Sequence, residues 1–257
     1  MIRAAAILAC LALVGCSGGP PSVRYSDGFM RNVRNTANPS TVAATEIAFA
    51  RAAREEGQWT AFRRFLADGG VIHGRNGVVD AAGFLATQSD PPAAVQWTPL
   101  AVWSSCDGQL AVAQGKFAEP DGSWGYYVTV WERQRNGTYR WSYDMGAPDT
   151  ALTERETRDR EPPAEDDATV IVVQAIPMIQ GEVADCRADA AAATGAAWPD
   201  TAGAATGGGI SRDGSLVWRW VHAADGRRMF AAQQWRGGAW EPSLDFAVTA
   251  EGRVDPQ

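Results

Sequence analysis

Two spacings of hydrophobic residues divide the chain into a helical part and β-rich parts. Between residues 40 and 67 apolar side chains recur at helical spacing, which predicts helices over Ser40–Glu56 and Gln58–Ala67. Asn38 and Pro39 are typical of a helix start, and Gly57 separates the two helices. Helices joined this closely must turn sharply and pack on a common core.

A strand and a third helix are expected next. The apolar residues at the start of Val71–Gly74 predict a short strand. Asp80 is a suitable N-cap for a short helix that would end near Thr87, before the helix-breaking Pro91 and Pro92.

From residue 95 onward, apolar and polar residues alternate with a period of two, which is the pattern of half-buried strands. Turn residues separate four such runs, and Asn136-Gly137 is the strongest hairpin signal among them. The four predicted strands are Val95–Ser104, Gln109–Ala118, Trp124–Gln134 and Thr138–Met145. Helices followed by an antiparallel meander predict an α+β fold.

A second β-rich region is predicted beyond an acidic, proline-containing stretch at 148–167 that has the composition of a linker. A β-branched run, Thr169–Ile176, predicts a buried strand, and Ala184–Gly209 is expected to be mostly loop. The strands of the second meander are Gly214–His222, Arg227–Trp235 and Trp240–Val248. Both meanders use Asp-Gly turns, but their unequal spacings favour shared hairpin patterns over duplication.

The N-terminus resembles a bacterial lipoprotein signal. Arg3 precedes an apolar run, Ala4–Val14, that is shorter than the roughly 20 residues needed to span a bilayer. Leu-Val-Gly-Cys ends this run, and the similarity to a lipobox implies cleavage before Cys16 and acylation (diacylglycerol and palmitate-type chains) of that residue. The alternative is ordinary signal cleavage near Gly19, which would leave a soluble protein.

This resemblance implies a protein of the cell envelope, anchored in the membrane by lipid and facing the periplasm. Ser17, in place of an aspartate after the lipidated cysteine, favours the outer membrane over the inner one. In that oxidising compartment Cys106 and Cys186 could form a disulfide across a loop of 79 residues (107–185). Two unrelated buried thiols are the alternative.

Charge and motifs exclude several classes of function. The net charge of −7 and the pI of about 4.9 argue against a nucleic-acid partner. The chain contains neither a P-loop motif nor HExxH, and His73 and His222 are its two histidines. We therefore predict no cofactor and no metal site.

The segment from Thr41 to Gly146 resembles the nuclear transport factor 2-like superfamily, and within it the SnoaL-like proteins. The similarity lies in stretches beginning at residues 44, 57, 105, 125 and 141: ATEIAFA, GQWTAF, SCDG, GYYVTVW and WSYDMG. It implies three helices on a curved antiparallel sheet, a cone with an apolar pocket, and pairing of sheets into a homodimer. The predicted organisation is signal peptide 1–15, tether 16–37, cone 38–147, linker 148–167, mostly β region 168–250 and tail 251–257.

Enzymes of this superfamily use an Asp or His base and an oxyanion donor in the pocket, and the candidates here are His73, Tyr127 and Asp144. Tyr126 and Tyr127 point to opposite faces, so one of them can line the pocket. Strict alternation would place Tyr139, Trp141, Tyr143 and Met145 on one face of the last strand. Asp144 would then lie on the polar face, paired with Arg140 or a turn amide, and His73 would bond a loop carbonyl.

Three functions follow from this pattern. We expect a non-catalytic binding or scaffold module with an apolar pocket for a small ligand; the alternative is a SnoaL-like isomerase, dehydratase or cyclase. A cavity that contains a base and a convergent donor would favour the enzyme. A third function, glycan binding, would require exposed rings at Trp218, Trp220 and Trp235, which are otherwise core residues.

Overall fold

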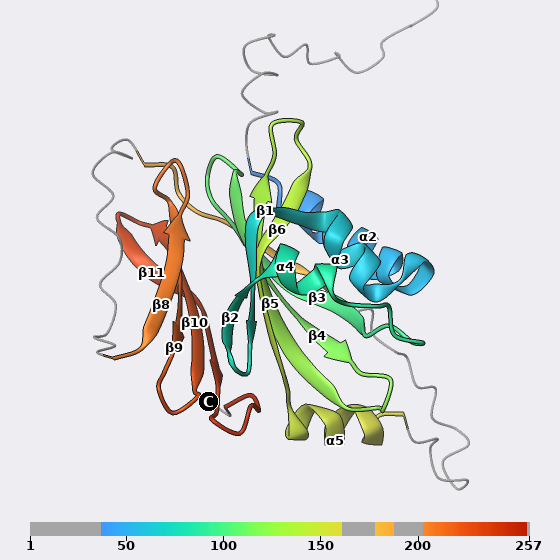
Figure 1. Cartoon of the computed structure of the whole chain (residues 1–257). Helices are drawn as coiled ribbons and strands as arrows, with labels where there is room; N and C mark the ends of the chain where they lie inside the picture. Colours follow the sequence, from blue (N-terminus) through green and yellow to red (C-terminus); the bar gives the residue numbers. More distant parts are fainter. Residues whose placement is uncertain (1–36, 161–177, 188–202, 256–257) are drawn as a thin grey trace, which may run out of the picture. The chain divides into compact units, whose positions relative to one another are not determined.

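The computed structural model describes residues 37–160, 178–187 and 203–255, and Figure 1 shows how their helices and strands are arranged. Cys16 and the predicted strand Thr169–Ile176 lie outside these ranges. Within them, no helix is long and apolar enough to cross a membrane.

The three helices expected before the meander are confirmed as α2 (Pro39–Glu56), α3 (Gln58–Phe65) and α4 (Ala81–Ala86). Asn38 caps α2 by accepting a hydrogen bond from the Ser40 amide at 3.1 Å. Asp80 caps α4 in the same way through the amide of Gly83, at 2.6 Å. Helix α3 ends earlier than predicted, because the chain becomes extended at Leu66.

The first sheet has seven strands in the order β2-β1-β6-β5-β4-β3-β7. Their bounds are β1 (Leu66–Gly74), β2 (Gly77–Asp80), β3 (Gln96–Ser104), β4 (Leu110–Ala118), β5 (Trp124–Arg133), β6 (Tyr139–Pro148) and β7 (Gln180–Val183). The predicted antiparallel meander β3–β6 is confirmed. The sheet is nevertheless mixed, because β1 pairs with β6, and β7 with β3, in parallel.

A β-bulge makes the predicted alternation along β6 wrong. Val130 of β5 pairs with Tyr143, whereas its neighbour Trp131 pairs with Trp141, so Ser142 is an extra residue in β6. Trp141 therefore packs toward the helices while Tyr143 packs on the opposite face. The extra residue also turns Asp144 toward the helices.

The predicted linker begins with a helix, α5 (Thr150–Arg158). Asp149 caps it by accepting from the Leu152 amide at 2.7 Å, and Leu152 is buried. Lys116 of β4 holds the same helix through an ion pair with Glu156 at 2.7 Å. The boundary between linker and β region lies in residues that the structure does not describe, so it stays a prediction.

The second sheet has four antiparallel strands in the order β11-β10-β9-β8. The predicted second meander is confirmed as β9 (Leu216–His222), β10 (Arg228–Arg236) and β11 (Ala239–Val248). The expectation of a loop is wrong for β8 (Ala205–Ile210), a glycine-rich strand. It pairs with β9, and a Cβ at Gly207 would lie 2.6 Å from the Trp220 ring, so the missing side chains make room for tryptophan.

The two meanders share more than their turn residues. Ser105 and Ser211 occupy the same place in the turns before β4 and β9, where each hydroxyl accepts a hydrogen bond from the leucine amide that begins the next strand. In the β10–β11 hairpin Ser243 is an extra residue between paired positions, as Ser142 is in β5–β6. The two meanders therefore share the position of a bulge as well as their turn residues.

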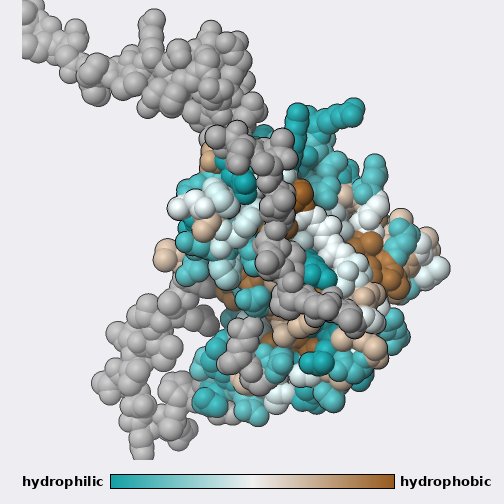
Figure 2. Space-filling model, turned by 90° about the vertical axis from the view of Figure 1, so that its left-hand side faces the viewer, coloured by the Kyte–Doolittle hydropathy of each residue, from teal (hydrophilic) through white to brown (hydrophobic). Residues whose placement is uncertain are grey.

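Each face of the first sheet belongs to a different core. Helices α2–α4 cover one face around Phe49, Trp131 and Trp141. The second sheet covers the other face, where Tyr143 and Met145 meet Phe230 and Phe246. Hydrophobic residues on the outside form separate small areas among polar ones on the face shown in Figure 2.

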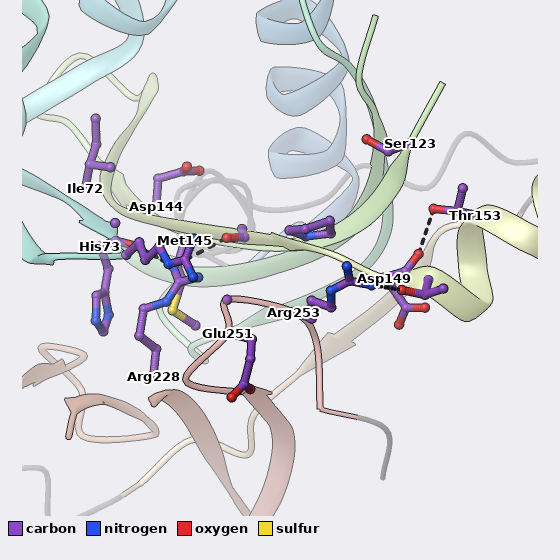
Figure 3. Close-up of a pocket in the computed structure, with 16 residues that line it drawn as sticks. Ile72, His73, Ser123, Asp144, Met145, Asp149, Thr153, Arg228, Glu251 and Arg253 are labelled. Atoms are coloured by element: carbon purple, nitrogen blue, oxygen red, sulfur yellow. Dashed lines mark hydrogen bonds between the residues drawn. The ribbon is translucent and has the colours of Figure 1, made fainter. Parts of the chain in front are cut away.

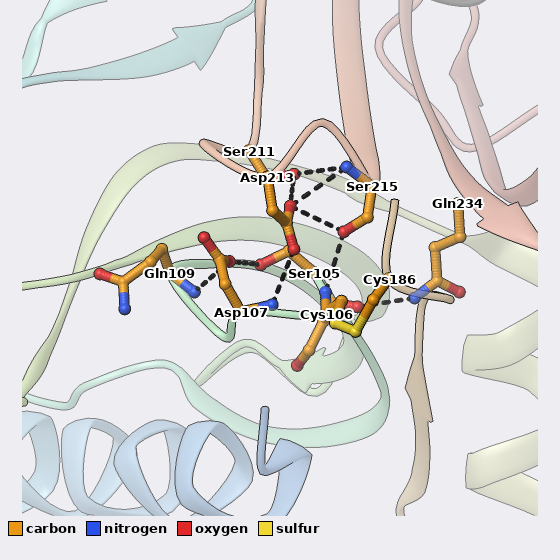
Figure 4. Close-up of a disulfide and its surroundings, with 10 residues drawn as sticks. Ser105, Cys106, Asp107, Gln109, Cys186, Ser211, Asp213, Ser215 and Gln234 are labelled. Carbon is orange, nitrogen blue, oxygen red and sulfur yellow. Dashed lines mark hydrogen bonds between the residues drawn. A yellow bond between two sulfur atoms is a disulfide. The ribbon is translucent and has the colours of Figure 1, made fainter. Parts of the chain in front are cut away.

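A disulfide joins Cys106 and Cys186, whose Cα atoms lie 5.1 Å apart (Figure 4). The turn that carries Cys106 also bonds the turn between β8 and β9. The Cys106 amide donates to Ser215 Oγ at 2.8 Å, and the Asp107 amide to Asp213 Oδ2 at 2.7 Å. The disulfide thus joins the turn after β3 to the segment that follows β7, both parts of the first sheet, whereas the tie from this turn to the second sheet consists of hydrogen bonds.

Candidate functional site

A cavity of about 300 Å³ lies between the first sheet and helices α2 and α3. Its apolar wall is largely aromatic, and its polar wall comes mainly from β5 and β6. The apolar lining includes Phe49, Trp59, Phe62, Trp97 and Phe117, and the polar lining consists of Gln58, Glu119, Tyr127, Thr129 and Asp144. The pocket expected from the family resemblance is therefore present, and two of the three candidate residues line it.

Asp144 supplies a carboxylate to this cavity. Its Oδ2 accepts a hydrogen bond from the Thr129 hydroxyl at 2.8 Å, while Arg140 instead donates to the carbonyl oxygens of Arg64 and Leu66. The predicted pairing of Asp144 with Arg140 is therefore wrong. Burial raises the pKa of Asp144 to about 6, and the Thr129 hydrogen bond opposes part of that rise. A carboxyl with this pKa is ionised at neutral pH and is still basic enough to take a proton.

Glu46 of α2 is a second carboxyl behind the cavity wall, and it is fully buried. Its two oxygens accept hydrogen bonds from the indole nitrogens of Trp131, at 2.9 Å, and Trp97, at 3.2 Å. Burial raises its pKa to about 8 against these hydrogen bonds, and the negative charge of Asp144 raises it further. Glu46 is therefore mostly protonated at neutral pH.

Both of these carboxyls influence the pKa of the nearby Tyr127 hydroxyl. Burial raises the pKa of its hydroxyl well above the usual value, and the charges of Glu46 and Asp144 add to the rise. The hydroxyl is buried, and it lies near enough to Glu46 for that carboxyl to act on its pKa as a hydrogen-bond partner, although no contact of normal hydrogen-bond geometry joins the two. A buried O–H in a cavity wall can turn to donate to an oxygen of a ligand.

Together these residues form an acid–base arrangement. Two carboxyls whose surroundings hold their pKa values apart can coexist as one anion and one neutral acid. Asp144 is the anion and faces the cavity, Glu46 is the neutral group behind it, and Tyr127 offers a donor. This cavity therefore contains a base and a hydroxyl donor in its lining.

Glu46 is the functional residue that the sequence analysis missed. The helical spacing within Ser40–Glu56 predicts an apolar face that would bury Ile47, but Ile47 is 45% exposed and the neighbouring Glu46 is buried. The sequence signal for Glu46 was a charged residue one position from an apolar stripe. This pattern is common on solvent-facing helices as well, so it did not identify a buried carboxyl.

His73 is not part of this cavity. It is 1% exposed on the opposite face of the sheet, hydrogen-bonded to the Tyr143 hydroxyl at 2.8 Å and to His222 at 3.0 Å. These contacts replace the predicted bond to a loop carbonyl. Burial lowers the pKa of His73 to about 3, helped by the positive charge of Arg228. A neutral imidazole of such low basicity is a poor proton acceptor.

The tryptophans considered for glycan binding do not form an exposed row. Trp218 is buried between the sheets, and Trp220 packs against the same core. Trp235 lies against Trp240, with ring centroids 5.7 Å apart, and not across from Trp218. The required aromatic surface is therefore missing from the second sheet as described.

The described ranges contain no group of three or more His, Cys, Asp or Glu side chains placed to hold a metal ion. No protein-family model matches the sequence, and no curated protein matches it as a relative. Among solved structures, a proposed ketosteroid isomerase from Shewanella frigidimarina NCIMB 400 is similar, with 16% sequence identity and a TM-score of 0.30. The alignment covers 41% of this chain and 94% of that chain.

Proposed function

We propose that this chain catalyses proton transfer on a small, largely apolar carbonyl compound, as an isomerase, dehydratase or cyclase does. The observation that carries the proposal is the presence of an ionisable Asp144 and the buried Tyr127 hydroxyl in the lining of one aromatic cavity. The sequence alone favoured a non-catalytic module. The polar groups in the cavity favour the alternative.

The chemistry assigns a role to each group. Asp144 takes a proton from the carbon next to the substrate carbonyl, and the electron pair moves to the carbonyl oxygen as an enolate. Tyr127 donates a hydrogen bond to that oxygen. The proton then returns to another carbon, or a hydroxyl group leaves with it as water. Glu46 does not line the cavity and is a positioning residue, which stays neutral and spares Asp144 a second nearby charge.

We also propose that residues 38–147 form a nuclear transport factor 2-like cone. Support comes from three helices on one face of a sheet with a central antiparallel meander, and from an aromatic pocket between them. A fold of this kind hosts both enzymes and scaffolds, so the function rests on the site and not on the fold.

Deuterium exchange into small ketones tests the catalytic proposal. Wild-type protein in D2O is expected to speed exchange of the protons beside the carbonyl of cyclic ketones, followed by NMR. Asp144→Asn should lower this rate about 100-fold or more, and Tyr127→Phe should lower it less. Asp68→Asn, which changes an exposed carboxylate of β1, is the matched control and should leave the rate unchanged.

The competing function is a binding module, favoured by the aromatic wall of the cavity. A protein that binds the ketones yet leaves their exchange rate at the level of Asp144→Asn would be such a module. That result would overturn the catalytic proposal but would leave the proposal that the aromatic cavity binds a small ligand.

We further propose that Cys16 carries the lipid anchor and that the protein faces the periplasm, as the lipobox-like sequence implies. Mass spectrometry of the native protein is expected to show acyl groups on an N-terminal Cys16. A mass that begins near Gly19 without acyl groups would instead support ordinary signal cleavage.

A further inference from the structure

A second cavity, of about 690 Å³, lies where the neighbouring strands β1 and β6 diverge. The pairing of these strands ends at Ile72 and Asp144, and residues of β10 and of the turn after β11 close the gap. Figure 3 shows Arg228 and Met145 on one side of β6 and Asp144 on the other. The wall of this second cavity is therefore built by both sheets, and the cavity shares Asp144 and Gly146 with the lining of the aromatic cavity.

Arg228 is the unusual residue of this second cavity. It is 4% exposed, and its Nη1 donates to the carbonyl oxygen of His73 at 2.9 Å and, more weakly, to that of Gly146 at 3.5 Å. Its Nε is buried without a hydrogen-bond partner, and no described carboxylate pairs with it. A buried charge that lacks a counter-charge is unfavourable, so this guanidinium lowers the free energy of unfolding of the protein.

The acidic residues of the same wall have other partners. Asp144 accepts from Thr129, and Asp149 caps helix α5. The pKa of Glu251 is lowered by hydrogen bonds to its own backbone and to Thr249, and by Arg75. None of them therefore neutralises Arg228. The exposed Arg75 and Arg253 add positive charge at the rim.

We propose that this second cavity binds the carboxylate group of a small organic acid on Arg228. Nη1 is bonded to backbone carbonyls and Nε has no partner, so the guanidinium keeps donor capacity that a carboxylate oxygen can accept from. A singly charged anion fits one unpaired cation, whereas a dianion such as phosphate would be repelled by Asp149 and Glu251. The proposal does not rest on the proton-transfer chemistry proposed above, although Asp144 lines both cavities.

Calorimetric titration with sodium acetate, hexanoate and benzoate at constant ionic strength tests the site. At least one of these acids is expected to bind wild-type protein saturably. Arg228→Gln should weaken that binding tenfold or more, the loss expected for a buried charge-assisted hydrogen bond. Arg227→Gln is the matched control, because Arg227 is the exposed neighbour that pairs with Asp225 and does not line the cavity.

Other variants keep the test decisive if Arg228→Gln does not fold. Arg75→Gln changes an exposed residue of the wall and should weaken binding roughly threefold, as a rim charge does. In wild-type protein the NMR signal of the Arg228 Nε–H should shift as the acid saturates. The proposal is overturned if none of the three acids binds saturably, if Arg227→Gln weakens binding as much as Arg228→Gln, or if inorganic phosphate binds more tightly than every acid.

Discussion

A buried carboxyl links protein stability to pH, and Glu46 is the clearest example in this chain. Its pKa is raised from 4.5 to about 8 by burial, so the folded protein holds a proton that the unfolded protein releases. The free energy of unfolding therefore falls as the pH rises between these two values. Asp144 acts in the same direction over a lower window, between its usual pKa of 3.8 and about 6.

Glu46→Gln is expected to flatten this pH dependence. Between pH 5 and pH 8.5 the free energy of unfolding of wild-type protein should fall, while that of the variant should fall much less. At pH 5 the variant should be less stable by about 1 kcal/mol, because an amide NH2 faces one of the two indole donors. Urea unfolding at the two pH values measures both effects. Parallel pH profiles for the two proteins would contradict an elevated pKa at Glu46.

At the scale of elements, the local patterns predicted helices and hairpins well but not the irregularities that build the site. Asn38, Asp80 and the Asp-Gly and Asn-Gly turns act through neighbouring backbone atoms, so a linear sequence contains their information. The extra Ser142 in β6 depends on its partner strand and has no sequence signature of its own. Because the alternation of faces reverses at Ser142, Asp144 lines the aromatic cavity, whereas strict alternation would have placed it on the other face of the sheet.

Strand β4 shapes the cavity through a missing side chain. Gly115 pairs directly with Tyr127, and a Cβ at this position would lie 2.5 Å from the Tyr127 hydroxyl and 2.3 Å from the Thr98 carbonyl oxygen. Gly115→Ala should therefore lower the free energy of unfolding by about 1–3 kcal/mol and displace the tyrosine.

Chemical denaturation and the rate of ketone exchange measure the two consequences of that substitution. Gly74→Ala is the matched control in β1, since its Cβ would lie 3.8 Å from the nearest backbone atom. Equal stability losses in the two alanine variants would show that Gly115 has no special role.

For the molecule as a whole, the second sheet occupies the outer face of the first and shares a core with it. The homodimer expected from family resemblance stays a prediction, and pairing through this face of the first sheet would require the second sheet to move away. The sequence indicated two β-rich regions with similar turns. It could not show that they face each other, because that depends on contacts between residues about 100 positions apart.

The Cys106–Cys186 disulfide should stabilise the fold by tying the turn after β3 to the segment that follows β7. Its sequence separation is 80, and closing a loop of that length is worth about 4 kcal/mol in the unfolded chain. Replacing both cysteines by serine should lower the free energy of unfolding by up to that amount. Thiol titration of unfolded wild-type protein should find no free thiol at these two positions without reductant, and two free thiols would show that the bridge does not form.

The most direct test of the account is a titration of the two carboxyls, because the proposed chemistry requires that they hold different protonation states at neutral pH. Carboxyl carbon NMR, with Asp144→Asn and Glu46→Gln for assignment, would follow both groups in one protein. We predict midpoints near pH 6 for Asp144 and near pH 8 for Glu46. Midpoints below pH 5 for both groups would mean two ordinary carboxylates, and the acid–base function would be contradicted.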